Sequence, residues 1–122
     1  MTEINNSLNQ PLKPKIVLGI AAHPDDLDFS SSGTIAHFAK LGAKIHYLIL
    51  TDGGQGTSDV KISPKQLQKI REEEQKNALK ILGGNKVYFL GYPDGNLVNN
   101  TDLKKDIVKV IRTVRPDVMI TR

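Results

Sequence analysis

The chain contains no cysteine among its 122 residues. It therefore has no disulfide, no thiolate metal site and no cysteine nucleophile. Aromatic residues make up only 5% of the sequence, so the formal net charge of +4 lacks the stacking side chains of nucleic-acid-binding surfaces. No hydrophobic run approaches the length of a membrane span, and the polar residues 1–14 contain no signal-peptide core. We therefore expect a cytoplasmic protein that does not bind nucleic acid and has no membrane span.

The length of the chain provides material for one domain. We predict a flexible tail over residues 1–14 and a folded domain over 15–122, and the sequence leaves open whether the chain is a homo-oligomer. Apolar runs predict buried strands, and amphipathic segments between them predict helices, which is the pattern of a parallel α/β sheet. The predicted strands are Ile16–Ala22, Lys44–Leu50, Lys86–Leu90 and Asp117–Thr121, and the predicted helices are Gly33–Leu41, the segment from Ser63 to Gly83, and Asp102–Val114.

Polar side chains follow successive strands at the points where these strands end. His23, Asp25 and Asp26 follow the first strand, Asp52 the second and Asp94 the third. Because parallel strands bring their carboxyl ends to one edge, these groups should converge there. Imidazole and carboxylate ligands suit a divalent metal such as zinc, and one group could remain free to handle a proton. The sequence therefore predicts a metal site at this edge.

The helix after Ser63 has the clearest local signals. Ser63 and Gln66 form a capping box around Pro64. We predict that Glu74 lies on or beside the buried stripe and pairs with Arg71 one turn earlier. The predicted stripe consists of Leu67, Ile70, Ala78, Ile81 and Leu82.

Other polar residues have simpler interpretations. His37 and His46 fall inside a predicted helix and strand, so packing or surface roles are favoured over metal binding. Asp28 is interpreted as polarity at the approach to a helix. The turn Gly53–Gly56 either holds an anion in a backbone nest or is shaped only by Asp52.

Five motifs occur in order along about residues 15–121. They are AHPDD at Ala22–Asp26 with Gly33 after it, LTDGGQGT at Leu50–Thr57, Arg71 with Glu74, FLGYPDG at Phe89–Gly95 and RPDVMIT at Arg115–Thr121. With these motifs the sequence resembles the LmbE-like or PIG-L superfamily of zinc-dependent N-acetylglucosaminyl deacetylases. This superfamily includes enzymes of the glycosylphosphatidylinositol, mycothiol and bacillithiol pathways and chitooligosaccharide deacetylases.

The resemblance implies a Rossmann-like three-layer sandwich with a mainly parallel sheet. It implies one catalytic zinc ion held by His23 and Asp26, with Asp25 as the general base that activates the zinc-bound water. It also implies that Arg71 and Asp94 contact the sugar. Gly54 stands where many relatives carry an acidic residue.

The same resemblance implies that this chain is the amino-terminal part of the domain, with a sheet incomplete at its C-terminus. In the family, a block like His-Pro-Asp-His after the fourth strand supplies the third zinc ligand and a catalytic histidine, whereas this chain ends at Arg122. We therefore expect the chain alone to be inactive. We expect the full-length protein to remove acetyl from an N-acetylglucosaminyl conjugate, with zinc or another divalent ion as cofactor.

Alternative functions differ in the number of bound metal ions. A non-catalytic sugar- or nucleotide-binding module would hold none, and a metal-dependent phosphoesterase would hold two. The deacetylase would hold one. The binding module is disfavoured because no Gly-x-Gly-x-x-Gly follows the first strand.

Overall fold

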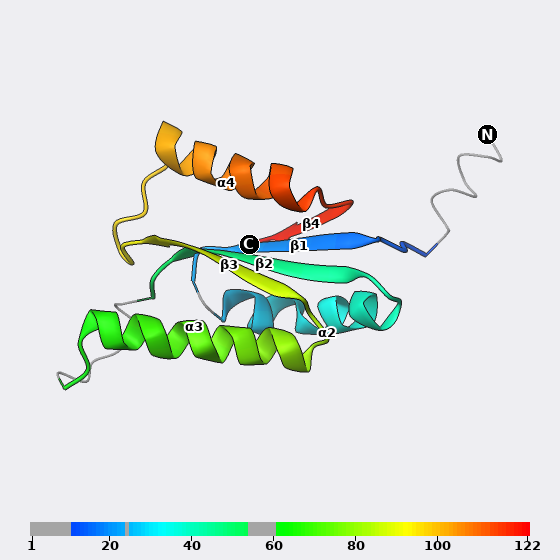
Figure 1. Ribbon diagram of the computed structural model, residues 1–122, viewed down its shortest axis with the longest axis horizontal. Helices are drawn as coiled ribbons and strands as arrows, with labels where there is room; N and C mark the ends of the chain where they lie inside the picture. The colour runs from blue at the N-terminus through cyan, green and yellow to red at the C-terminus, as the bar shows by residue number, and fades with distance from the viewer. Residues whose placement is uncertain (1–10, 24, 54–60) are drawn as a thin grey trace.

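The computed structural model describes residues 11–23, 25–53 and 61–122 and shows a three-layer α/β arrangement (Figure 1). All paired strands are parallel, as predicted, and the sheet order is β3-β2-β1-β4. The predicted tail over residues 1–14 and the turn Gly53–Gly56 lie largely outside the described residues. The elements are β1 (Ile16–Ala21), α2 (Asp26–Lys40), β2 (Lys44–Thr51), α3 (Pro64–Ile81), β3 (Lys86–Tyr92), α4 (Thr101–Val114) and β4 (Val118–Thr121).

The helices cover both faces of the sheet. In Figure 1, α2 and α3 lie on one face and α4 lies on the other. Alternating strand residues serve the two cores: Val17 and Ile45 pack with α2 and α3, whereas Leu18 and Leu48 pack with α4. A sheet covered on both faces requires apolar residues in near-continuous runs, which explains the strand sequences. The described part of the chain contains no helix long and apolar enough to span a bilayer.

The strand order has a topological switch point at β1. From β1 the chain proceeds outward to β2 and β3, and α4 then returns it across the opposite face to β4 on the other side of β1. The direction of winding therefore reverses at β1. Ligands of open α/β sheets bind beyond the carboxyl ends of the strands at such a reversal, and His23 and Asp25 lie there.

The helix after β1 begins earlier than predicted. The sequence predicts a short helix over Gly33–Leu41, but α2 starts at Asp26. Asp26 and Asp28 lie in its first turn, where carboxylates favour the positive end of the helix dipole. Leu27 packs onto β1 at Gly19, where an added Cβ would lie 2.8 Å from Leu27 Cδ1. Residues 30–33, three serines and a glycine, have low helix propensity. The packing of α2 on the sheet nevertheless keeps them helical.

The buried stripe of α3 also differs from the predicted one. Leu67 and Leu79 are buried, but Ile81 is 85% exposed and Ile70 is 44% exposed. Gln75 is buried between the two leucines, with only 2% exposure. Because Gln75 is polar, the spacing of the apolar residues alone does not predict which residues of α3 are buried. The capping box of Ser63 and Gln66 is present as predicted.

The third strand is longer than predicted because it contains a bulge. Ile49 pairs with Phe89 and Thr51 pairs with Tyr92, so β3 has an extra residue against β2. Gly91 accommodates the irregularity in the left-handed region, with φ at 72°. The bulge carries the strand onward to Tyr92 and leads directly into the loop that holds Asp94.

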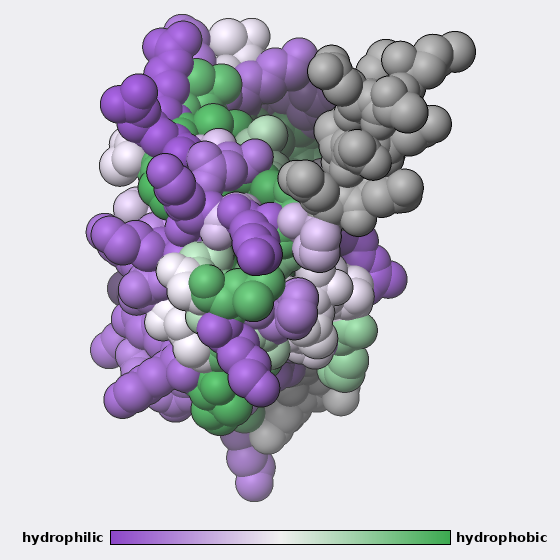
Figure 2. All heavy atoms as spheres, turned by 90° about the vertical axis from the view of Figure 1, so that its right-hand side faces the viewer, coloured by the Kyte–Doolittle hydropathy of each residue, from purple (hydrophilic) through white to green (hydrophobic). Residues whose placement is uncertain are grey.

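The amino-terminal edge of the sheet lies at the opposite end of the molecule. Figure 2 shows that end, where hydrophilic side chains predominate among the described residues and smaller hydrophobic areas lie between them. The polar residues singled out in the sequence at strand ends lie at the other end of the sheet.

Candidate active site

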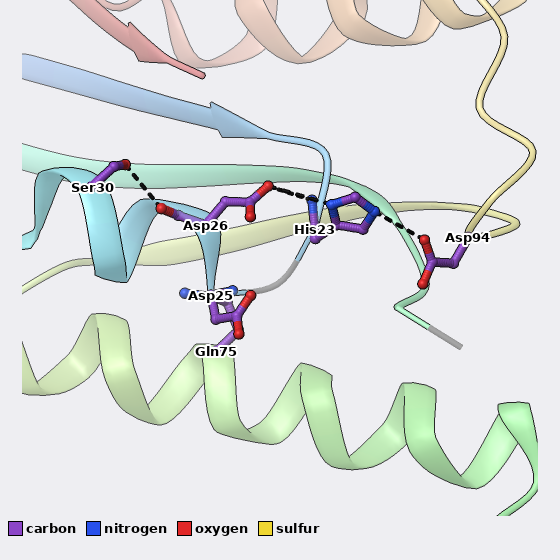
Figure 3. Close-up of polar contacts among 6 residues, drawn as sticks. All are labelled: His23, Asp25, Asp26, Ser30, Gln75 and Asp94. Atoms are coloured by element: carbon purple, nitrogen blue, oxygen red, sulfur yellow. Dashed lines mark hydrogen bonds and ion pairs between the residues drawn. The ribbon is translucent and has the colours of Figure 1, made fainter. Parts of the chain in front are cut away.

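The His23 side chain lies between carboxylates at the carboxyl end of β1 (Figure 3). Its Nε2 is 2.9 Å from Asp94 Oδ1, and its Nδ1 is 3.5 Å from Asp26 Oδ2. The His23 backbone N–H also donates to Asp26 Oδ2, at 3.2 Å. Both ring nitrogens of His23 therefore face an acidic group, one from the helix that follows β1 and one from the loop after β3.

The predicted convergence of strand ends is confirmed. Asp52, directly after β2, accepts a hydrogen bond of 3.0 Å from the Asp94 backbone N–H. His23, Asp52 and Asp94 are thus linked at one edge of the sheet. Asp94 is mostly covered, with a side-chain exposure of 11%, whereas that of His23 is 49%.

Asp25 occupies the N-cap position of α2 in an unusual conformation. Its φ and ψ are 83° and −19°, in the left-handed region, and its side chain makes no capping hydrogen bond. Aspartate at an N-cap normally accepts from the first-turn amides. Here the Asp25 backbone N–H donates instead to Gln75 Oε1 of α3, at 2.7 Å. The carboxylate of Asp25 is consequently not engaged in capping the helix.

A small cavity of about 150 Å³ opens beside Asp25, between α2 and α3. Burial raises the pKa of Asp28, the hydrogen bond from Gln75 opposes this change, and the nearby Asp25 charge adds to it. Gln75 Nε2 lies 3.3 Å from Asp28 Oδ2. Asp28 is therefore more than polarity at a helix approach, and Gln75 was missed by sequence reasoning. The cavity is lined by Asp25, Asp28, Arg71, Glu74, Gln75 and Ala78.

The predicted pair of Arg71 and Glu74 is present. Arg71 donates to Glu74 Oε2 at 2.8 Å. The Glu74 side chain is 57% exposed, so it lies outside the buried stripe. The ion pair leaves Arg71 at the cavity that Asp25 lines, whereas His23, Asp26 and Asp94 form the adjoining cluster.

The remaining histidines lie inside secondary structure, as predicted. His37 belongs to α2 and His46 to β2. Burial lowers the pKa of His46, and the positive charges of Lys86 and Lys44 lower it further. Its buried Nδ1 has no hydrogen-bond partner among the described residues. Neither histidine joins the polar groups at the strand ends.

His23 and Asp26 provide a donor pair that fits a zinc ion. Their Nδ1 and Oδ2 atoms are 3.5 Å apart. Two ligands about 2.1 Å from a tetrahedral zinc ion would be roughly 3.4 Å apart. Within residues 11–23, 25–53 and 61–122, no group of three or more histidine, aspartate or glutamate side chains could hold a metal ion. The pair is smaller than the three protein ligands that catalytic zinc usually has.

A family model described as PIG-L, GlcNAc-PI de-N-acetylase, matches residues 18–122. The chain belongs to the PIG-L family. The diacetylchitobiose deacetylase of Thermococcus kodakarensis is 36% identical over 98% of this chain and 45% of its own length. The chain thus spans less than half of this curated relative.

Solved structures that are similar to this chain share its fold. The N,N'-diacetylchitobiose deacetylase of Pyrococcus horikoshii is 36% identical, with a TM-score of 0.84 over 87% of this chain and 40% of that structure. The 4-carboxy-2-hydroxymuconate hydratase of Pseudomonas putida is 27% identical, with a TM-score of 0.78 over 86% of this chain and 45% of that structure. A protein named as a deacetylase and one named as a hydratase therefore share this fold.

Proposed function

We propose that this chain is the amino-terminal part of a metal-dependent hydrolase that removes acetyl from an N-acetylglucosaminyl conjugate. The observation that carries the proposal is the arrangement around His23. A donor pair from His23 and Asp26 lies beside Asp25, whose carboxylate is not used for capping. The family membership and the deacetylase relatives support acetamide hydrolysis over other uses of the same edge.

His23 and Asp26 would hold the metal ion, and residues outside this chain would complete its ligands. Catalytic zinc usually has three protein ligands and one open position. When bound, such an ion lowers the pKa of a water molecule and polarises a carbonyl oxygen. Zinc fits an imidazole and carboxylate pair, and other divalent ions accept the same ligands.

Asp25 would act as the general base and then as the acid. One of its carboxylate oxygens accepts a proton from the attacking water as the new C–O bond forms at the acetamide carbon. The C–N bond then breaks, and the same oxygen returns the proton to the leaving nitrogen. The step yields acetic acid and the neutral amine, and Asp25 is again unprotonated; in water near neutral pH the products are acetate and the protonated amine.

Arg71 and Asp94 would orient the sugar. Arg71 lines the cavity next to Asp25, and its guanidinium can donate to hydroxyl oxygens of a substrate. Asp94 lies on the other side of His23, where its carboxylate can accept from sugar hydroxyls. Polar groups on both sides of His23 and Asp26 are compatible with a sugar substrate, and the relatives support the N-acetylglucosaminyl class.

The test is acetate release by the full-length protein from a panel of N-acetylglucosaminides, with metal content measured on the same samples. We expect one bound ion per site and acetate equal to the amine formed. A phosphate ester and an unsaturated dicarboxylic acid serve as controls for a phosphoesterase and a hydratase. Turnover of a control substrate without acetate release from any member of the panel would contradict the proposal.

A further inference from the structure

The backbone at Asp25 is held in a conformation that aspartate rarely adopts. Its φ of 83° lies in the left-handed region, which is disfavoured for residues that carry a Cβ. The residue stands at an N-cap, where an extended backbone and a capping side chain are the usual state. A contact from elsewhere in the fold must therefore oppose the relaxation of Asp25 to that state.

Gln75 provides such a contact from the middle of α3. Its Oε1 accepts from the Asp25 backbone N–H at 2.7 Å across 50 residues of sequence. Its side chain is almost completely buried, with 2% exposure, which limits competition from water for this hydrogen bond. Figure 3 shows Gln75 rising from α3 directly beneath Asp25.

Asp28 fixes the orientation of the Gln75 amide. Gln75 Nε2 lies 3.3 Å and 3.5 Å from the two carboxylate oxygens of Asp28. An ionised carboxylate only accepts hydrogen bonds, so the NH₂ group must face Asp28 and the oxygen must face Asp25. The first turn of α2 thus orients the side chain that holds its own N-cap.

We propose that Gln75 is a positioning residue that keeps the Asp25 carboxylate away from the amides of α2 and available for proton transfer. The inference rests on the proposed function, in which Asp25 is the base. Without the hydrogen bond from Asp25 to Gln75, Asp25 relaxes toward an ordinary N-cap. Its carboxylate then accepts from first-turn N–H groups, which turns it away from the position of the reacting water.

The first test compares two glutamine-to-methionine variants of the full-length protein. In Gln75→Met the hydrogen bonds to Asp25 and to Asp28 are lost with little change in size, and we expect kcat to fall by about 10- to 100-fold. KM should change by less than about threefold, and metal content should stay the same, because the variant leaves binding groups in place. Gln68→Met is the matched control, since Gln68 lies two turns earlier on α3 and donates to Glu72 instead.

A double variant tests the hydrogen bonds independently of side-chain packing. In Gln75→Glu with Asp28→Asn, the glutamate accepts from the Asp25 N–H and from the asparagine amide, so donors and acceptors are exchanged and total charge is kept. We expect this variant to retain kcat within about fivefold of the unmodified protein. A folded double variant as impaired as Gln75→Met would overturn the proposal.

Failure of the proposed function is separable from failure of this inference. If the unmodified protein releases no acetate, the function is wrong, and the positioning role is then decided by hydrogen exchange at the Asp25 amide. We expect that amide to be protected in the unmodified protein and in Gln68→Met, and to exchange at least tenfold faster in Gln75→Met. Equal exchange rates in all three, or equal kcat in the two methionine variants of an active protein, would show that Gln75 does not position Asp25.

Discussion

The two ring nitrogens of His23 face different carboxylates, so Asp26 and Asp94 have different roles in the proposed site. Nδ1 faces Asp26, at a separation suited to two ligands of one ion, whereas Nε2 is in hydrogen-bonding contact with Asp94. Histidines that bind metals usually donate their other N–H to a carboxylate or carbonyl group. Asp94 therefore has a second role open to it besides the predicted contact with sugar.

Substitutions at the strand end should separate metal binding from proton transfer. We expect His23→Ala and Asp26→Ala to lose bound metal in the full-length protein. Asp25→Asn should keep the metal and lose about 10²- to 10⁴-fold in kcat, because an amide cannot take the proton. Metal analysis beside acetate release tests both expectations, and near-normal turnover by Asp25→Asn would show that the base is a different group.

Removal of the Asp94 carboxylate should weaken metal binding even though Asp94 is not a proposed ligand. We expect Asp94→Ala to reduce metal affinity by about 10- to 100-fold, because the His23 ring loses the partner that orients it. Asp94→Asn should be milder, since its amide oxygen still accepts from Nε2–H. Competition with a chelator measures both affinities, and unchanged affinity in Asp94→Ala would restrict Asp94 to substrate contacts.

At the scale of helices and strands, glycine positions differ in how closely other side chains pack against them. Gly84 follows α3, and a Cβ there would lie 2.1 Å from Cδ1 of the buried Leu79. Gly33 lies inside α2, and a Cβ there would meet no described atom within 4 Å. Close packing against Leu79 therefore requires glycine at position 84, whereas no described neighbour requires it at position 33.

The two glycines should respond oppositely to alanine. We expect Gly84→Ala to lower the free energy of unfolding by about 1–3 kcal/mol through overpacking against Leu79. Gly33→Ala should raise it by roughly 0.5–1 kcal/mol, because alanine favours the helix interior. Urea unfolding of both variants tests the pair. Destabilisation by Gly33→Ala would indicate that something beyond the described residues packs on that face of α2.

A hydrogen bond between β3 and α4 should make stability depend on alkaline pH. Tyr92 OH donates to Asp106 Oδ2 at 2.5 Å, and this bond, with burial and the negative charges of Asp106 and Asp102, raises the pKa of Tyr92 to about 12. The folded state therefore retains a proton that the unfolded chain loses near pH 10.

The contribution of Tyr92 should be complete below pH 10 and disappear as pH rises toward 12. We expect Tyr92→Phe to show a shallower loss of unfolding free energy over this range than the unmodified protein. Burial also raises the pKa of Tyr47, so a decline common to both proteins should remain. Parallel curves for the two proteins would show that Asp106 does not hold the Tyr92 proton.

For the whole molecule, we expect the number of metal ligands that this chain contributes to decide how well the proposed site binds an ion. The chain spans 45% of the Thermococcus relative and contributes His23 and Asp26 as the proposed ligand pair. An ion with two protein ligands retains more water and binds less tightly than one held by three. The site should therefore depend on residues outside this chain.

The isolated chain should bind zinc weakly and release no measurable acetate. Calorimetric titration of residues 1–122 with zinc, beside the same titration of the full-length protein, measures the difference. The His23→Ala variant of the full-length protein is the control for non-specific binding. Tight binding of one ion by the isolated chain, with turnover like that of the full-length protein, would place the third ligand within this segment.

The sequence alone determined the features that depend on neighbouring residues. The strand ends at His23, Asp52 and Asp94 follow from apolar runs, and the capping box at Ser63 follows from residues three positions apart. Parallel pairing then brings the strand ends to one edge. Such patterns are local or follow from topology, so the sequence is sufficient to predict them.

Only the tertiary structure decided how the candidate base is held. The early start of α2, the bulge at Gly91 and the burial of Gln75 all result from packing between segments distant in sequence. Gln75 reaches Asp25 across 50 residues, and no local pattern couples them. The sequence places a carboxylate at the end of β1, but the backbone conformation of Asp25 depends on α3, because a hydrogen bond forms only where the fold brings donor and acceptor together.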